Sequence, residues 1–430
     1  MLSKHQCSLA YRLLHQYSKC LVFHWYSNVE IVGQEHIPYG KPCIIQANHQ
    51  NALMDCVTLL GFFRQPILFF ARSDMFSKPL QMKILHFLKI LPAYRHQEGW
   101  ENVKKNEENF HVAQQWLQQG LPLCIMPEGG QDEKHRLRSF VKGPFRIALA
   151  TQHDIGQAEQ VFMLPIGIGH GDYNKAGYPL LINIGKPIDV QTYLDEYQKN
   201  NALAINHLKT DVHQALQPLM LDIASQEHYE DFYTIACLCD VLLMKKRQWR
   251  HTQLNQLKAR QSIIDTLQQM EKEEQLSSEL LQASQKLRIS HKNVLLLAKS
   301  LQSDNEKWTN VLFVMCTLPL YIVGGVVNFP IWLLMFWIDK KMGKSGFAAT
   351  INYVIWIILS PIFQLLASII IGICLQSWLV FIVLIVAMPI LSLFCVKYYT
   401  RLQLLGYQLG CRKQKSIALL IQNIVSQMNI

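Results

Sequence analysis

The sequence has few charged residues for its length, which is unusual for a soluble protein. Charged residues make up 17% of the 430 positions and hydrophobic residues make up 50%, whereas soluble proteins average about 25% charged residues. The charges sum to +10, which favours a negatively charged partner such as nucleic acid or an anionic membrane surface. Because the last third of the chain is strongly apolar, we predict a lipid bilayer as the partner and no nucleic acid.

The motifs of several common cofactor and nucleophile sites are missing as well. The eleven cysteines include no C-x-x-C pair, and the sequence has no glycine-rich nucleotide loop, zinc-ligand spacing or EF-hand pattern. We therefore predict no metal, no redox cofactor and reduced cysteines that serve packing. The G-x-S-x-G elbow, which presents the nucleophile in many hydrolases, is also missing and argues against a hydrolase.

The amino terminus lacks the basic segment, apolar core and cleavage site of a signal peptide, so we expect the N-terminal part to stay in the cytosol. Residues 1 to 28 favour an amphipathic helix at a membrane interface, because Leu9, Leu13 and Leu21 can share one face while Arg12 lies elsewhere. A helix packed on a protein core explains the same residues equally well.

Short apolar runs alternate with helical stretches between residues 29 and 195. This alternation is typical of an α/β domain with a largely parallel sheet, in which ligands bind beyond the strand ends. The runs that predict strands cover residues 29–33, 42–45, 66–71, 90–95, 121–126, 161–168 and 180–184.

The remaining chain predicts three further regions. Residues 196 to 308 are rich in Gln, Leu, Lys and Glu and have helical periodicity, so we expect a helical domain. Residues 309 to 397 are predicted to be embedded in a membrane as transmembrane or re-entrant hairpins, and residues 398 to 430 form a basic cytosolic tail.

The positions of the basic residues predict how the apolar blocks cross the membrane. Lysines and arginines precede, separate and follow the two blocks, so by the positive-inside tendency each block should be a hairpin. The run 310 to 338 would be about 43 Å long as one helix, which exceeds the ~30 Å hydrocarbon core. Pro319, Gly324, Gly325 and Pro330 interrupt it, so we favour a short re-entrant or kinked hairpin over one tilted span. The protein is expected in the bacterial inner membrane with its α/β domain facing the cytosol.

A histidine and an aspartate lie at the junction of a predicted strand and a predicted helix. His49 follows the strand 42–45, and Asp55 lies within the next apolar run. Such a pair can act as a base and the carboxylate that orients it. Taken alone, a histidine at the end of a buried strand is also compatible with a purely structural role.

Three further motifs follow in the same domain: PAYR at 92–95, IMPEGG at 125–130 and MLPIGIG at 163–169. Together with NHQNALMD at 48–55 they resemble, in order and separation, the four blocks of the glycerolipid acyltransferases, a family that includes the glycerol-3-phosphate and 1-acylglycerol-3-phosphate acyltransferases. The resemblance covers about residues 30 to 190 and implies an α/β acyltransferase domain.

Two positions depart from the family pattern. Five residues separate His49 from Asp55 where the family usually has four, and Met126 stands where the third block usually begins with Phe. The longer spacing and the P-E-G-G sequence are similar to the branch that contains fungal-type glycerol-3-phosphate acyltransferases. This similarity leans towards glycerol 3-phosphate as the acceptor, with lysophosphatidate left open.

The resemblance also implies roles for particular residues. His49 would be the general base that Asp55 orients, Arg95 would bind the acceptor's phosphate, and Glu128 with Gly129 would bind the acceptor. Two cations outside the motifs, Lys142 and Arg146, could complete a basic pocket, although ordinary surface cations near a helix start explain them as well.

A second histidine, His170, lies beside Asp172 in the sequence HGDYNK and could imitate a His/Asp pair. Because it follows the strand of the fourth block, we predict a solvated loop residue there.

These observations predict a membrane-bound acyltransferase of phospholipid synthesis. The donor would be an acyl-thioester, acyl-CoA or acyl carrier protein, and the acceptor a glycerol phosphate. Because a thioester is already activated, direct attack by the hydroxyl requires a base and no covalent acyl-enzyme. The alternative is an acyltransferase-like membrane protein that binds lipid without catalysis.

Overall fold

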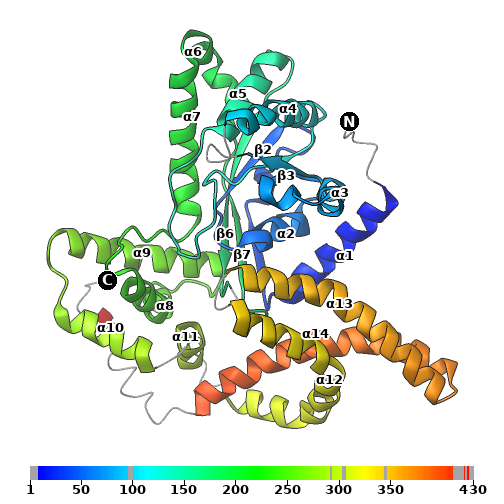
Figure 1. The fold of residues 1–430 in the computed structure, drawn as a ribbon. Helices are drawn as coiled ribbons and strands as arrows, with labels where there is room; N and C mark the ends of the chain where they lie inside the picture. Colours follow the sequence, from blue (N-terminus) through cyan, green and yellow to red (C-terminus); the bar gives the residue numbers. More distant parts are fainter. Residues whose placement is uncertain are drawn as a thin grey trace. The chain divides into compact units, whose positions relative to one another are not determined.

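The computed structural model describes residues 8–94, 100–173, 175–290, 293–302, 307–342, 346–409, 421 and 424–425. The chain divides into two compact units (Figure 1). The first, here the α/β unit, runs to Met220 but omits residues 24–28 and 171–179. These two short segments belong with residues 221–430 to the second, here the helical unit.

The α/β unit is built on one mixed, mostly parallel sheet in the order β1-β7-β6-β2-β5-β3-β4, with β8 paired to β6. All pairings are parallel except those of β6 with β7 and with β8. The prediction of an α/β domain with a largely parallel sheet is therefore confirmed. The strands are β1 (Val29–Val32), β2 (Cys43–Ala47), β3 (Leu68–Arg72), β4 (Ile90–Ala93), β5 (Leu123–Cys124), β6 (Phe162–His170), β7 (Leu180–Ile184) and β8 (Ile188–Asp189).

Helices cover both faces of this sheet. Figure 1 shows α7 and α2 on opposite sides of β6 and β7. On the side of α7, the fully buried Trp116, Phe145 and Leu208 pack in one core with Ile44 and Met163 of the sheet. The helices are α1 (Leu9–Trp25), α2 (Ala52–Phe62), α3 (Pro79–Phe87), α4 (Trp100–Leu117), α5 (Gly143–Ile155), α6 (Leu194–Lys199) and α7 (Asn201–Leu216).

Helices bury both faces of the sheet at β2, and this explains why the strand is a short apolar run in the sequence. All five of its residues are buried, as expected for a central strand of a parallel sheet with helices on each side. The carboxyl end of β2 is therefore held rigidly, and the residues that follow it emerge at an edge where parallel α/β sheets commonly bind ligands.

The helical unit contains α8 (Tyr229–Lys246), α9 (Gln253–Lys272), α10 (Ser278–Ser290), α11 (Val294–Gln302), α12 (Lys307–Met342), α13 (Gly346–Cys374) and α14 (Trp378–Leu409). Its first four helices share an apolar core that includes Phe232, Ile235, Ile263 and Leu287. Helices thus occupy most of the described residues between 229 and 302. The predicted helical domain begins earlier, at residue 196, whereas residues up to Met220 belong to the α/β unit.

Helices α12, α13 and α14 are each long and apolar enough to cross a membrane. The block 347 to 396 forms two helices joined at Leu375–Ser377, where Gln376 has a positive φ of 50°. Gln376 and Ser377 are two adjacent polar positions of this second apolar block, where the hairpin expected of it would turn.

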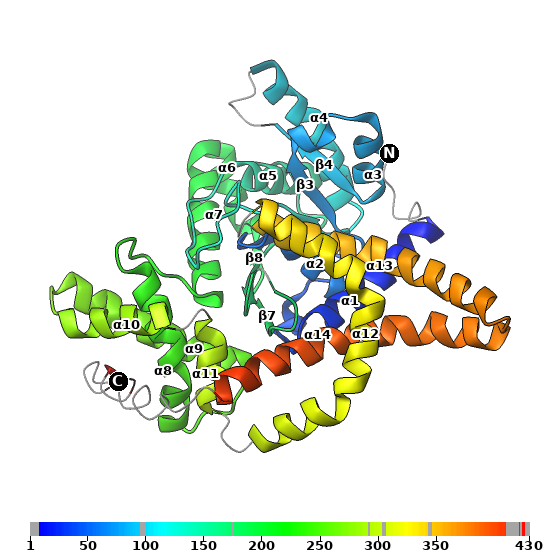
Figure 2. The same ribbon diagram turned by 60° about the horizontal axis from the view of Figure 1, so that its bottom comes forward.

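The break predicted within residues 310 to 338 is wrong, because α12 continues through Gly324 and Gly325. Figure 2 shows that the helix is bent, as is expected of a helix that contains Pro319 and Pro330. Gly324 serves packing instead: a Cβ at this position would clash with Cys395 and Leu391 of α14.

Candidate active site

The candidate site begins directly after β2, where the chain turns sharply into α2. Asn48 fastens this turn to the neighbouring strand β6, since its Nδ2 donates to the carbonyl of Ile168 (3.0 Å) and its Oδ1 accepts from the Ile168 N–H (2.7 Å). Ala52, the first residue of α2, has a positive φ of 41°, a conformation rare outside glycine that is often found at functional sites. Asn48 therefore fixes the start of the loop that carries His49.

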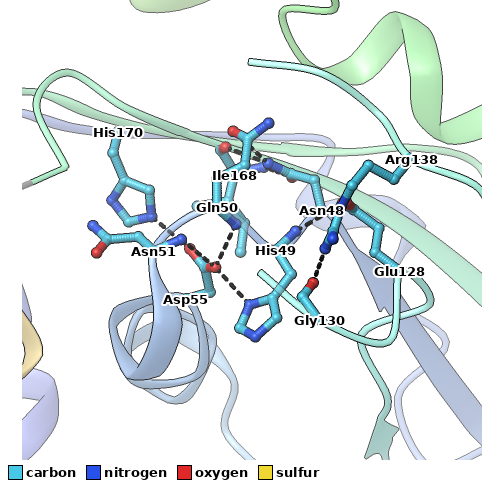
Figure 3. A network of polar contacts seen from close by, with 10 residues as sticks. All are labelled: Asn48, His49, Gln50, Asn51, Asp55, Glu128, Gly130, Arg138, Ile168 and His170. Carbon is cyan, nitrogen blue, oxygen red and sulfur yellow. Dashed lines mark hydrogen bonds and ion pairs between the residues drawn. The ribbon is translucent and has the colours of Figure 1, made fainter. Parts of the chain in front are cut away.

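Asp55 is the centre of the site. It lies fully buried in the first turn of α2. Its Oδ2 accepts hydrogen bonds from the backbone N–H groups of Gln50 (3.0 Å) and Asn51 (2.9 Å) and from Nδ1 of His49 (2.9 Å). The two backbone donors come from the loop between His49 and Asp55, so the longer spacing of this chain still closes around the carboxylate (Figure 3).

The electrostatics of this pocket keep Asp55 ionised. Burial raises the pKa of the Asp55 carboxyl, but hydrogen bonds and charge interactions with His170 and then His49 outweigh it, so the pKa lies well below its usual range. The start of a helix also favours a negative charge. An ionised carboxylate only accepts hydrogen bonds, which requires His49 to carry its proton on Nδ1 and leaves Nε2 with a free electron pair.

His49 is the member of the network that reaches the surface. Its side chain is 19% exposed, against 0% for Asp55, and its Nε2 points away from the carboxylate (Figure 3). A histidine held by one nitrogen on a buried carboxylate, with the other nitrogen presented outwards, can remove a proton from a bound hydroxyl. The sequence-predicted pair is thus in hydrogen-bond contact.

The interpretation of His170 as a solvated loop residue is wrong. His170 is the last residue of β6, where it pairs with Leu180 of β7. Its side chain is fully buried, and its Nε2 donates to Oδ1 of Asp55 at 2.7 Å. Two histidines therefore share one carboxylate, one on each oxygen.

Glu128 joins the loop after β5 to the same site. Its side chain is 1% exposed; Oε1 accepts the backbone N–H of His49 (3.0 Å) and Oε2 accepts Nε of Arg138 (2.8 Å). Burial raises the pKa of Glu128, although the Arg138 guanidinium opposes this shift. Arg138 also donates to the carbonyl of Gly130, and Gly129 adopts a φ of 65° where a Cβ would meet Val141 at 2.7 Å. Motif comparison did not identify Arg138.

The other predicted binding residues are Lys142, Arg146 and Arg95. Lys142 immediately precedes α5, Arg146 lies in its first turn, and both are exposed. Arg95 is outside the described residues.

Two cysteines lie near Asp55 without being nucleophiles: Cys124 is buried and Cys56 is half-buried. Burial raises the pKa of Cys56 to about 12, and it raises the pKa of Cys124 well above its usual value. Both are therefore protonated thiols at neutral pH, whereas nucleophilic cysteines are thiolates. Among the residues that the structure describes, no group of three His, Cys, Asp or Glu side chains could hold a metal ion.

Comparison with known proteins agrees with this geometry. Residues 28–169 match the acyltransferase family. A 1-acyl-sn-glycerol-3-phosphate acyltransferase of Borreliella burgdorferi is 25% identical over 183 residues, 42% of this chain and 70% of that protein. The chloroplastic 1-acyl-sn-glycerol-3-phosphate acyltransferase BAT2 of Brassica napus is 27% identical over 123 residues, 28% of this chain and only 34% of that protein.

Among solved structures, the crystal structure of the 1-acyl-sn-glycerophosphate acyltransferase PlsC from Thermotoga maritima is similar, with 22% identity and a TM-score of 0.33 over 46% of this chain and 79% of that chain. The match to the family spans the loop of His49, the Asp55 helix start, Glu128 and β6. The α/β unit of this chain therefore belongs to the acyltransferase family, and lysophosphatidate acyltransferases are its distant homologues.

Proposed function

We propose that this protein is a membrane-bound O-acyltransferase that moves a fatty acyl group from an acyl-thioester to a hydroxyl of a glycerol phosphate. The observation that carries the proposal is the His49–Asp55 pair, 2.9 Å apart and exposed only at the histidine, inside a domain of the acyltransferase family. Such a pair supplies the single catalytic group that acyl transfer from a thioester requires.

The reaction needs no covalent enzyme intermediate. Nε2 of His49 takes the proton of the acceptor hydroxyl while the oxygen attacks the thioester carbonyl. The new C–O bond forms, the C–S bond breaks, and the leaving thiolate takes the proton back from the imidazolium. Asp55 stabilises the imidazolium through Nδ1. The protonated state of Cys56 and Cys124 is consistent with this direct route.

The acceptor is proposed to be glycerol 3-phosphate or lysophosphatidate. Relatives named as 1-acyl-sn-glycerol-3-phosphate acyltransferases support lysophosphatidate, while the longer His-to-Asp spacing and the P-E-G-G sequence lean towards glycerol 3-phosphate. Arg95 is the proposed phosphate ligand because its planar guanidinium suits that group. Lys142 and Arg146 add positive charge, and Glu128 with Gly129 shapes the acceptor side of the site.

Location in a membrane fits both the substrates and the chain. The three long apolar helices α12, α13 and α14 supply the anchor, and the basic residues that flank them favour a cytosolic α/β unit. We place the protein in the bacterial inner membrane, where acyl-CoA or acyl carrier protein can deliver the acyl group from the cytosol.

The test is an assay of purified membranes with labelled glycerol 3-phosphate and, separately, lysophosphatidate, each with acyl-CoA and acyl-carrier-protein donors. His49→Ala should abolish transfer and leave membrane insertion intact. His207→Ala is the matched control, because His207 also pairs with a carboxylate, Glu196 at 3.0 Å, but is 54% exposed; it should keep full activity. Transfer by His49→Ala would overturn the mechanism, and lipid binding without transfer by the wild type would favour a non-catalytic role.

The role of Arg95 is tested in the same assay. Arg95→Ala should mainly raise the acceptor KM, because it removes the proposed phosphate ligand and leaves the base in place. An unchanged KM would remove Arg95 from the phosphate site.

A further inference from the structure

Helix α3 has its apolar side turned away from its own domain. Leu80, Ile84 and Phe87 follow one another at intervals of four and three residues, so they form one stripe along the helix. They are 69%, 49% and 39% exposed, and α3 has no buried residue. A surface helix of a soluble domain normally buries such a stripe against the core. The exposed stripe therefore needs an apolar neighbour outside this domain.

Helix α1 repeats this feature beside α3. Leu9 and Leu13, four residues apart, are 68% and 62% exposed. The buried ring of Tyr11 meets the edge of the Phe87 ring with 6.1 Å between centroids, so the two helices are neighbours, as Figure 1 also shows. We call Leu9, Leu13, Leu80, Ile84 and Phe87 together the α1–α3 apolar face.

The charged residues of α1 and α3 themselves all have one sign, although an exposed ion pair, Arg72 with Asp74, precedes α3. Arg12 on α1 and Lys83 on α3 are exposed, Lys78 is exposed at the start of α3, and neither helix contains Asp or Glu. Apolar side chains bordered by cations fit the boundary of an anionic bilayer, where the side chains enter the acyl region and the cations meet headgroups. An acidic protein partner would match the cations but would not cover exposed leucines at this density.

We propose that the α1–α3 apolar face is an interfacial membrane-docking surface that lies in the headgroup region of an anionic bilayer. It is separate from the helices long enough to span a membrane, since it belongs to the α/β unit. Docking would hold the acyltransferase domain against the lipid surface from which a lipid substrate or acyl chain is drawn. The proposal does not depend on the catalytic role of His49.

The test uses the full chain in proteoliposomes that contain phosphatidylglycerol, with the exposed cysteines changed to serine. A nitroxide is attached to Leu80→Cys or Ile84→Cys, and to Leu203→Cys on α7 as the matched control, since Leu203 is also an exposed leucine (42%) of the same unit. At positions 80 and 84, we expect higher collision rates with oxygen than with a water-soluble nickel complex, and the reverse at position 203. Water-like accessibility at both α3 positions would overturn the proposal. Immobilisation without oxygen access would point to a protein partner and would also overturn it.

A second inference concerns His170 and rests on the proposed function. His170 places a hydrogen-bond donor 2.7 Å from Oδ1 of Asp55, while His49 occupies Oδ2. The groups packed around the carboxylate are His49 from the loop after β2, His170 from β6, Cys56 from α2 and Cys124 from β5, with Glu128 and Arg138 beyond His49. The His170 side chain is fully buried, whereas that of His49 is 19% exposed.

We infer that His170 is a positioning residue that acts on His49 through Asp55. Its bond fixes the rotation of the carboxylate, so that Oδ2 faces Nδ1 of His49. It also draws electron density towards Oδ1, so Oδ2 becomes a weaker acceptor for Nδ1 of His49. His170 therefore sets both the orientation of the base and the strength of the bond that holds it.

The test compares His170→Leu, which removes the donor, with His170→Gln, which keeps an N–H near the position of Nε2. We expect His170→Leu to lower kcat about tenfold with acceptor KM unchanged, and to move the acid limb of the pH–rate profile upwards because Asp55 then holds the proton of His49 more strongly. His170→Gln should restore most of the rate. Wild-type kinetics in His170→Leu, or equal impairment of both variants without a pH shift, would overturn the role of His170. An active His49→Ala enzyme would instead overturn the proposed function itself.

Discussion

Two of the buried networks of polar side chains in the described part of the chain differ in charge and in exposure, and the comparison shows which features a reactive site needs. The network of the α/β unit is centred on an ionised carboxylate, Asp55, and reaches the surface at His49. The second network lies among the three long apolar helices of the helical unit and consists of neutral groups.

The neutral network links α12, α13 and α14. Nε2 of Gln364 donates to Ser392 (2.7 Å) and to Ser360 (2.9 Å), Ser392 donates to Asn328 (2.5 Å), and Asn328 donates to the carbonyl of Gly324 (2.7 Å). All four side chains are buried. Interhelical bonds of this kind hold apolar helices together in a membrane, where the hydrophobic effect cannot.

The two networks show what a polar cluster needs in order to react. Both satisfy buried donors and acceptors, which stabilises the fold. Only the Asp55 network contains a member that can take up a proton at neutral pH and meets solvent. Removing the charge from one network and adding charge to the other should therefore have opposite consequences for activity and stability.

The largest effect is expected from Asp55→Asn. The amide offers His49 either a donor or a weaker acceptor, so the tautomer with a free Nε2 is no longer held and the imidazolium is no longer stabilised. We expect kcat to fall roughly 10⁴-fold. Steady-state kinetics on purified protein measure this, with Asp154→Asn, an exposed aspartate beside His153, as the control. A variant with more than a tenth of wild-type kcat would contradict the role of Asp55.

The converse change, Gln364→Glu, should damage stability and spare chemistry. It adds a carboxylate between apolar helices, where an acidic side chain costs about 3 kcal/mol. We expect less protein in the membrane and a lower Tm, with unchanged kcat per folded molecule. Gln364→Met is the neutral control and should cost only about 0.6 kcal/mol for the lost bonds. Equal Tm values for the two variants would show that the network tolerates charge.

Removing Arg138, the cation that pairs with Glu128, should have an intermediate effect on kcat. Arg138→Gln leaves the 1% exposed Glu128 without its ion pair, so Glu128 becomes easier to protonate and holds the His49 backbone less firmly. We expect kcat to fall about tenfold, with partial recovery in Arg138→Lys. If Arg138→Gln matches the wild type at neutral pH, the ion pair has no part in holding His49.

The pair His49–Asp55 could be predicted from the sequence because it is local. Both residues lie within one strand-to-helix turn, whose apolar flanks fix the secondary structure. The alternation of buried runs and helices likewise predicted the sheet. By contrast, Arg138 lies in an irregular segment ten residues after Glu128, and no periodicity indicates where an irregular segment turns its side chains.

The two predictions that failed depend on long-range contacts. From the sequence, His170 is expected in a solvated loop after the fourth block, and Gly324 with Gly325 are expected to interrupt the first apolar run. In the structure, β6 continues to His170, whose side chain reaches Asp55, and a Cβ on Gly324 would clash with Cys395 of α14. Turns and tight packing both select glycine, and only the long-range contacts distinguish the two.

A smaller effect is expected from pH, because the two carboxylates of the site have opposite pKa shifts. The lowered pKa of Asp55 means that its stabilisation is complete above the ordinary aspartate value of about 4 and is lost only as the pH falls through the lower folded value. The raised pKa of Glu128 means that the folded protein binds a proton more readily than the unfolded chain, so its contribution to stability falls as the pH rises through the raised value.

Thermal unfolding between pH 5 and 7.5 separates these signs. The Tm difference between wild type and Asp55→Asn should stay constant across this range. The difference between wild type and Glu128→Gln should shift in favour of the wild type towards pH 5. A gap that narrows for Asp55→Asn in this range would mean that its carboxyl titrates near neutrality.

The smallest effect is expected from Cys56→Ser, and it separates direct transfer from a covalent route. Cys56 directly follows Asp55, but its thiol stays protonated because burial raises its pKa to about 12. A protonated thiol is a poor nucleophile towards a thioester, so the serine variant should keep kcat within about twofold. Iodoacetamide should likewise leave the wild-type rate unchanged, and no acylated Cys56 should be found by mass spectrometry after quenching a single turnover. A rate that falls with Cys56→Ser while the Tm is unchanged would place a nucleophile beside Asp55, and the two networks would then differ by a covalent step as well as by a charge.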